Sequence, residues 1–191
     1  MSRPTRQTPG GRAYLDLQNR ARREKRTTQE LLTLYVLERW LARLAASPHA
    51  NTFVLKGGLL LAVFDARRST ADADLLARHL ANDQDTITNR VKDIAQVVLA
   101  EDDGVEYLAE TTIADTIRED TDHTGVRVAM NCSVSTAAVK LRLDINVGDP
   151  VTPAPQLIEL PSQRPDIPAV SLLGYPLETV LAEKASTAIA L

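Results

Sequence analysis

The chain has 191 residues, of which 44% are hydrophobic and 25% charged, a composition typical of one globular domain with a buried core. Its single cysteine excludes an intrachain disulfide and, with only three histidines, argues against a zinc site. No run reaches the roughly 20 apolar residues that span a bilayer, and no apolar segment follows the N-terminal arginines as in a signal peptide. We therefore expect a cytoplasmic protein with no membrane segment.

The formal net charge of −3 is unevenly distributed. Residues 1–26 contain eight arginines and lysines against two acids, so the remainder of the chain is strongly acidic. A basic segment of this kind can bind the phosphates of a nucleic acid, and it can equally be a solvated tail. We interpret residues 1–26 as a basic, partly disordered N-terminal arm in which a helix starts near Gly11.

A long amphipathic helix is predicted after this arm. Thr27 or Thr28 can cap its first turn, and Ser47-Pro48 ends it. Its apolar side chains recur at intervals of three and four residues: Leu31, Leu34, Tyr35, Leu37, Trp40, Leu41 and Leu44. A short apolar strand at 52–56 then runs into Gly57-Gly58, and residues 59–66 are predicted to form a two-turn buried helix.

The stretch "STADADLLA" (69–77) alternates and predicts a strand, and residues 83–101 predict a second amphipathic helix. Four further strands are expected at 105–117, 125–134, 138–148 and 155–161, and a last helix at 175–191 with Pro176 in its first turn. These elements indicate an α+β fold, an α/β mixed sheet flanked by helices. We assign the core to residues 27–175 and the start of a C-terminal helical region, expected to be incomplete, to residues 176–191.

Two aspartates occupy alternate positions of the strand predicted at 69–77. Residues two apart in a strand point to the same face, so Asp72 and Asp74 would repel each other unless a cation lies between them. Mg2+ prefers such hard oxygen ligands, and Asp144, flanked by apolar residues in a later strand, is the candidate third ligand. Taken singly, a D-x-D pair is more often solvated surface, and Asp144 could be a strand-end residue that makes a hydrogen bond.

Gly57-Gly58 lies between a strand and a helix, where backbone N–H groups can bind phosphate. Arg67 and Arg68 follow and could neutralise a triphosphate, and the Thr70 hydroxyl would share the face of the aspartates. A glycine pair taken alone is usually only a turn. The order of these features along the chain favours a nucleotide site.

Four segments, "FVLKGGLLLAVF", "RRSTADADLL", "LRLDINVG" and "YPLETVLAEKAST", resemble the AbiEii/AbiGii-type toxin nucleotidyltransferases, including the MenT group of mycobacterial toxins. The resemblance covers residues 50–191. It implies a polymerase-β-like nucleotidyltransferase core with N-terminal helices and the start of a C-terminal helical bundle. It also implies Mg2+ at the D-x-D pair, Asp72, Asp74 and Lys184 as catalytic residues, and an NTP site made of Lys56, Gly57, Gly58, Arg68, Thr70 and Lys184.

Two features depart from the family pattern. Many relatives have serine at the position of Gly58, so one hydroxyl is missing from the phosphate turn. The family pattern also continues to a further aspartate beyond the helix that carries Lys184, whereas this sequence stops at Leu191. Without the resemblance, Lys184 would be interpreted as part of the solvated face of a helix.

The resemblance implies a toxin of a toxin-antitoxin system that adds nucleotides from an NTP to the 3′ acceptor end of tRNA, with release of pyrophosphate, and so blocks aminoacylation and translation. The basic arm would bind the acceptor stem through its phosphates. A cognate antitoxin is the expected protein partner, and Thr70 is a candidate for regulatory phosphorylation, as reported for some relatives. Two alternatives stay open: nucleotidylation of a protein hydroxyl, and a catalytically silent RNA-binding or antitoxin-like module.

Overall fold

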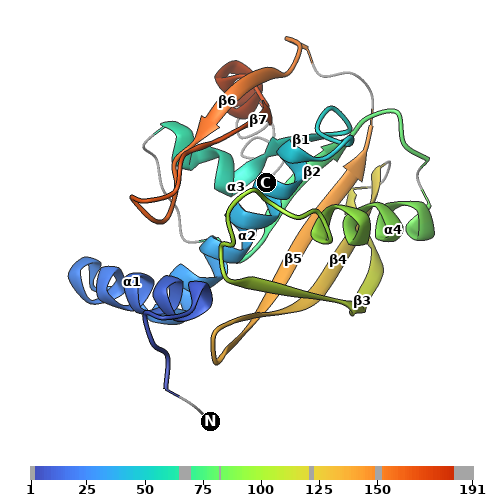
Figure 1. Cartoon of the computed structure of the whole chain (residues 1–191). Coiled ribbons are helices and arrows are strands. Elements are labelled where there is room, and N and C mark those ends of the chain that lie inside the picture. Colours follow the sequence, from blue (N-terminus) through green and yellow to red (C-terminus); the bar gives the residue numbers. More distant parts are fainter. Residues whose placement is uncertain (1–2, 65–69, 82, 121–122, 149–151, 183–191) are drawn as a thin grey trace.

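The computed structural model describes residues 3–64, 70–81, 83–120, 123–148 and 152–182. One mixed sheet of seven strands forms its centre, in the order β3-β4-β5-β2-β1-β7-β6 (Figure 1). Strand β2 runs parallel to β5 and β1 runs parallel to β7, whereas all other neighbours are antiparallel. The strands are β1 (Phe53–Lys56), β2 (Ala73–Ala77), β3 (Val105–Asp120), β4 (His123–Val134), β5 (Ala137–Val147), β6 (Gln156–Leu160) and β7 (Val170–Gly174).

The helices are α1 (Pro9–Glu24), α2 (Thr28–Ala46), α3 (Gly57–Leu60) and α4 (Gln84–Ala95), with a 3-10 turn η1 (Leu61–Phe64) directly after α3. Helix α2 begins as predicted, because the Thr27 side chain accepts a hydrogen bond from the Glu30 N–H at 3.1 Å. Its buried face contacts β5, β7 and α4. The Trp40 ring lies edge-on to Phe53 of β1, with 6.4 Å between the ring centroids.

The two faces of the sheet differ in chemistry. Along β5, alternate residues are fully buried toward the helices: Val139, Leu141, Leu143 and Ile145. The residues between them point to the opposite face and are polar or charged: Lys140, Arg142, Asp144 and Asn146. Because register aligns neighbouring strands, the same alternation carries the charged side chains of β1, β2 and β4 to that opposite face.

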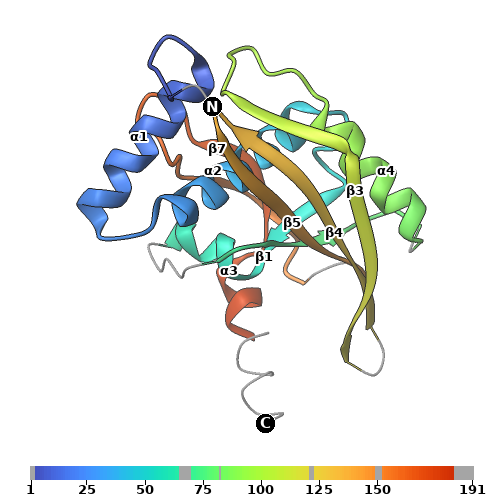
Figure 2. The ribbon, with the colours of Figure 1, turned by 90° about the horizontal axis from the view of Figure 1, so that it is seen from below.

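Helix α1 belongs to the folded body from Pro9 onward, a result that the basic composition of the arm did not predict. Ala13, Leu17 and Ala21 are buried against α2, with which α1 packs (Figures 1 and 2). Part of the positive charge of residues 1–26 is paired within the fold, because Arg20 forms an ion pair with Glu24 at 2.6 Å and Arg26 forms one with Glu30 at 2.8 Å. Arg20 also donates to the Gln163 carbonyl at 2.6 Å. The apolar positions of α1 are few and small, so they did not stand out among the arginines.

Several element boundaries differ from the prediction. The helix expected at 83–101 ends at Ala95, leaving Val98 91% exposed, and the strand expected at 69–77 begins only at Ala73. Strand β7 was not predicted, and residues 177–182 are helical as expected. Strand β3 bends strongly where three extra residues are inserted opposite β4 between Leu108 and Ile113 (Figure 2). Among the described residues, no helix combines the length and the apolar character needed to cross a membrane.

Candidate active site

A row of charged residues crosses five neighbouring strands. Lys56 of β1 is in register with Asp74 of β2, and Asp74 with Asp144 of β5. Asp144 is in register with Arg127 of β4, and Arg127 with Asp115 of β3. Cross-strand neighbours in register point to the same side, so this row lies on the face opposite α2. The structure thus brings together Lys56, Asp74 and Asp144, three of the residues predicted from the sequence.

Asp72 and Thr70 reach the site by a different route from the one predicted. Both precede β2, so they are held by a turn rather than by a regular strand. The Thr70 hydroxyl lies 3.0 Å from the Asp72 carbonyl oxygen and 3.0 Å from Asp72 Oδ1, to which it can donate. This interaction places the hydroxyl beside the Asp72 carboxylate.

Asp74 is half-buried and packs against the glycine turn. The Gly58 N–H donates a long hydrogen bond of 3.4 Å to Asp74 Oδ2. Burial raises the pKa of Asp74 above its ordinary range, a backbone hydrogen bond from Gly58 opposes this rise, and the negative charges of Asp72 and Asp144 add to it. Asp74 is thus close enough to Asp72 and Asp144 for their charges to act on it.

Gly57 supplies the space for this arrangement. Its φ of +67° lies in the left-handed region, and a Cβ placed on it would collide with the Asp74 carboxylate. At Gly58 a Cβ would meet only Thr70 Oγ1, at an ordinary contact distance of 3.4 Å. A Cβ at Gly58 would therefore fit, whereas any side chain at Gly57 would displace Asp74.

Arg127, which no sequence pattern singled out, binds Asp144 through two hydrogen bonds. Its Nε donates to Oδ1 at 2.7 Å and one terminal nitrogen donates to Oδ2 at 2.6 Å. The Asp144 side chain is 8% exposed and that of Arg127 is 49% exposed. The pKa of Arg127 is raised chiefly by this hydrogen bond and by the charge of Asp144, with smaller contributions from Asp72 and Asp74.

The chemistry of Asp72, Asp74 and Asp144 suits a divalent cation, because closely spaced carboxylates offer hard oxygen ligands and relieve their repulsion on binding one. The structure holds the third carboxylate on Arg127, however. In the part of the chain that the structure describes, no three histidine, cysteine, aspartate or glutamate side chains are grouped so that they could hold a metal ion together. Arg67, Arg68 and Lys184 lie outside the described residues.

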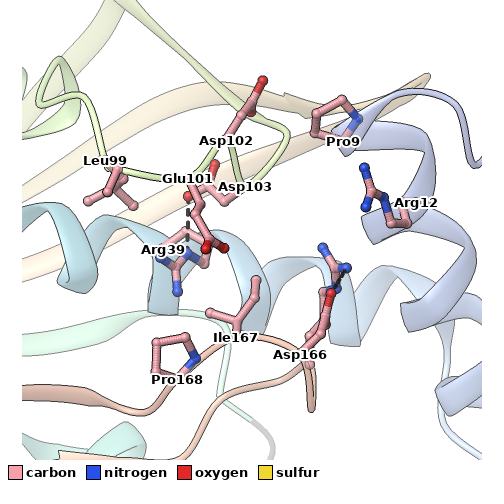
Figure 3. Close-up of a pocket in the computed structure, with 12 residues that line it drawn as sticks. Pro9, Arg12, Arg39, Leu99, Glu101, Asp102, Asp103, Asp166, Ile167 and Pro168 are labelled. Carbon is pink, nitrogen blue, oxygen red and sulfur yellow. Dashed lines mark hydrogen bonds and ion pairs between the residues drawn. The ribbon is translucent and has the colours of Figure 1, made fainter.

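A cavity of about 600 Å³ lies elsewhere, between the start of α1, α2 and the loops before β3 and β7 (Figure 3). Arg39 reaches Asp103 on one wall and Arg12 faces it from the other. None of the residues predicted for the nucleotide site lines this cavity. The carboxylate site and the cavity are therefore separate features.

The residues of the charged row fall within the range matched by one family description. The model of the family described as nucleotidyl transferase AbiEii toxin, type IV toxin-antitoxin system, matches residues 39–190. Among solved structures, JHP933 from Helicobacter pylori is similar to this chain with a TM-score of 0.50 and 20% sequence identity, over 82% of this chain and 56% of that one.

A second Helicobacter pylori chain, provisionally named a nucleotidyltransferase, gives the same TM-score and identity over 82% of this chain and 58% of its own. At 20% identity these two similarities support the fold alone. The chain spans little more than half the length of either structure. No curated protein matches it.

Proposed function

The chain belongs to the family of nucleotidyl transferase AbiEii toxins of type IV toxin-antitoxin systems, and from this membership we propose that it transfers a nucleoside monophosphate from an NTP to the 3′ acceptor end of tRNA. In this reaction an acceptor hydroxyl oxygen bonds to the α-phosphorus, the bond from that phosphorus to the β-phosphate oxygen breaks, and pyrophosphate and a proton are released. Within the family, the tRNA-modifying MenT group is the proposed functional counterpart, with blocked aminoacylation and translation as the toxic effect.

One observation carries this proposal. Asp74, at the end of the Asp72-Ala73-Asp74 segment, lies against the Gly57-Gly58 turn, where Gly57 leaves no room for a side chain beside the Asp74 carboxylate. Carboxylates next to a glycine turn at the start of a helical segment offer a cation site and a phosphate site side by side. A structural role alone does not require a carboxylate such as Asp74 to lie where burial and the charges of Asp72 and Asp144 raise its pKa.

Asp72, Asp74 and Asp144 would hold Mg2+, which would supply charge neutralisation at the α-phosphate and the leaving pyrophosphate. The chain itself contributes orientation: the Gly57-Gly58 turn would lie beside the triphosphate, and the Gly58 N–H, which donates to Asp74 Oδ2 here, could donate to a phosphate once Asp74 binds the cation. Lys56 lies beside Asp74 in register. We propose Arg68 and Lys184 as further contacts of the phosphates, on the basis of the family resemblance.

A transfer assay tests this function. The protein is incubated with Mg2+, total tRNA and each α-labelled NTP in turn, with Asp74→Asn as the inactive variant and Asp115→Asn as the control. Asp115 is an exposed aspartate at the β3 end of the same row, so it matches Asp74 in charge and face. We expect labelled tRNA with the wild type and the control only.

The destination of the label separates the alternatives. Label on protein rather than on tRNA would favour nucleotidylation of a protein hydroxyl. No label on either, with intact folding and intact NTP binding, would contradict the enzymatic proposal and favour a silent RNA-binding module.

A type IV system implies an antitoxin partner, and we propose Thr70 as a position at which this toxin could be silenced. Its hydroxyl lies beside the Asp72 carboxylate, so a phosphoryl group there would add about −1.5 to −2 charges next to an already acidic site. NTP binding would then fail without unfolding. Mass spectrometry of toxin co-expressed with its antitoxin tests this: an unmodified Thr70 in silenced toxin would contradict it, and Thr70→Glu should lose activity.

A further inference from the structure

The two side chains of the Arg127–Asp144 pair differ in how far they can move. Asp144 is 8% exposed and lies on β5, between β4 and β2 in the interior of the sheet, so its position is fixed. Arg127 has a side chain that is 49% exposed and ends a flexible stem. The guanidinium can therefore leave the carboxylate for solvent, whereas the carboxylate cannot leave the site.

The charges around this pair show why Asp144 needs a cation. Asp144 is in register with Asp74, so their carboxylates lie on the same face of neighbouring strands, and Asp72 directly precedes β2. Removing Arg127 would leave a buried carboxylate beside two others without its bidentate partner. A divalent cation bound by all three would supply the missing charge in place of the guanidinium.

We infer that Arg127 is a built-in counterion that occupies Asp144 in the absence of a divalent cation and is displaced when the cation binds. Arg127 is thus a positioning residue, which holds the third carboxylate and lowers the affinity for the cation by competing for the same oxygens. The inference rests on the proposed function only in taking Asp72, Asp74 and Asp144 as the ligands.

A permanent structural ion pair is the competing explanation, and the two differ in what Arg127→Gln does. If the pair is only structural, the variant loses stability and binds cations no better. If Arg127 competes, the variant binds cations more tightly. Arg142→Gln is the matched control, because it removes the same charge as Arg127→Gln. Arg142 is exposed and lies on the same face of β5, two residues from Asp144.

The experiment measures Mn2+ affinity by the electron paramagnetic resonance signal of free Mn2+, without nucleotide or RNA. We expect Arg127→Gln to bind Mn2+ at least about tenfold more tightly than the wild type, since a charge-assisted bidentate contact no longer has to be broken. Arg142→Gln should change the affinity less than about twofold, because an exposed charge is screened. Arg127→Lys keeps the positive charge but loses the bidentate guanidinium contact, so its affinity for Mn2+ should lie between those of the wild type and Arg127→Gln.

A double-mutant comparison confines the effect to Asp144. In an Asp144→Asn background, Arg127→Gln should give no further gain in Mn2+ affinity. The inference is overturned if Arg127→Gln binds no more tightly than the wild type, if Arg142→Gln gives the same gain, or if the gain persists without the Asp144 carboxylate. Should Arg127→Gln fail to fold, as judged by its unfolding transition, Arg127→Lys decides between the same outcomes.

The result separates this inference from the proposed function. Mn2+ binding by the wild type without a gain in Arg127→Gln overturns the counterion role and leaves the cation site intact. Absence of Mn2+ binding in both proteins overturns the counterion role and also removes the cation from the proposed reaction.

Discussion

Gly57 is the residue at which the backbone and the carboxylates come closest. Its φ of +67° costs an ordinary L-residue about 1–2 kcal/mol, and a Cβ would also displace the Asp74 carboxylate. We expect Gly57→Ala to lower the free energy of unfolding in urea by at least this amount and to abolish nucleotide transfer. Gly58→Ala is the control and should keep both, because its Cβ would make only an ordinary contact with Thr70. Equal losses in the two variants would contradict this reading of the turn.

The pH dependence of stability gives a test of Asp74. Burial raises its pKa in the folded protein above that of the unfolded chain, so the folded state binds the proton more tightly. The stability that protonated Asp74 contributes is complete below its unfolded pKa, about 3.9, and is lost as the pH rises through the folded pKa. Without divalent cation, Asp74→Asn should therefore be more stable than the wild type at neutral pH, and the difference should vanish in acid.

Adding Mg2+ should reverse the order at neutral pH, because a cation stabilises only the protein that retains the carboxylate. Thermal unfolding with and without Mg2+ measures both effects, with Asp115→Asn as the exposed control. A lower stability of Asp74→Asn at neutral pH in the absence of cation would contradict the assigned direction of the pKa shift.

Helix α1 changes how the basic arm must be tested. Deleting residues 1–26 would remove Ala13, Leu17 and Ala21 from the core, so lost RNA binding could reflect unfolding. Arg22 and Arg23 offer a cleaner test, since both are exposed in the last turn of α1. Replacing both with alanine should leave the free energy of unfolding unchanged. It should also make the plot of log K for tRNA binding against log salt concentration less steep, by about 2 in slope.

Leu17→Ala is the companion variant, because Leu17 is fully buried between α1 and the core. We expect it to lower the free energy of unfolding by about 2–5 kcal/mol and to keep the salt slope. An unchanged slope in the double-arginine variant would exclude the exposed end of α1 from RNA binding.

The sequence was informative where a signal was local. The start of α2 could be predicted because Thr27, Glu30 and the apolar spacing all agree within a few residues. Strand β7 was missed because its five residues, Val-Ser-Leu-Leu-Gly, are too short a run to show a clear apolar alternation. Thr70 and Asp72 were wrongly predicted to lie within the strand, because the alternation of polar and apolar residues already begins before Ala73. That pattern alone does not show where the hydrogen bonds between strands begin.

The pairing of Arg127 with Asp144 illustrates a different limit. Strands β4 and β5 are joined through the two residues Ser135 and Thr136, and this tight hairpin fixes the register that brings Arg127 opposite Asp144. Ser135 adopts a φ of +56°. Because neither residue is the glycine, asparagine or aspartate typical of such turns, the hairpin register could not be predicted, and Arg127 resembled any exposed strand arginine.

At the scale of the whole molecule, buried charge joins α2 to the loop before β3. The Asp103 carboxylate accepts hydrogen bonds from Arg39 at 3.0 Å and from Arg43 at 2.6 and 3.1 Å, and the Tyr35 hydroxyl donates to the Asp103 carbonyl at 2.8 Å. Burial would raise the pKa of Asp103, but the contacts with Arg43 and Arg39 outweigh it and lower the pKa. This cluster therefore stabilises the fold in its charged form.

We expect Asp103→Ala to lower the free energy of unfolding by about 3–5 kcal/mol, because the buried guanidinium groups of Arg43 and Arg39 lose this carboxylate, although Arg39 also pairs with Glu38. The stabilisation should be present above the unfolded pKa of aspartate and disappear as the pH falls through the lowered pKa of Asp103. Urea unfolding at neutral and acidic pH measures this. The control is Asp102→Ala, an exposed neighbour, and a comparable loss in that variant would contradict the role of the buried cluster.

The topology of the sheet also orders the events of folding. The β4–β5 hairpin closes through a two-residue turn, whereas β2 must find β5 across some 70 positions, and Leu55 of β1 meets Gly174 of β7 across more than 100. Local pairing is faster because little chain entropy is lost in closing a short loop. We therefore expect Arg127 to pair with Asp144 before β2 reaches β5, so that Asp74 joins a carboxylate whose charge is already balanced.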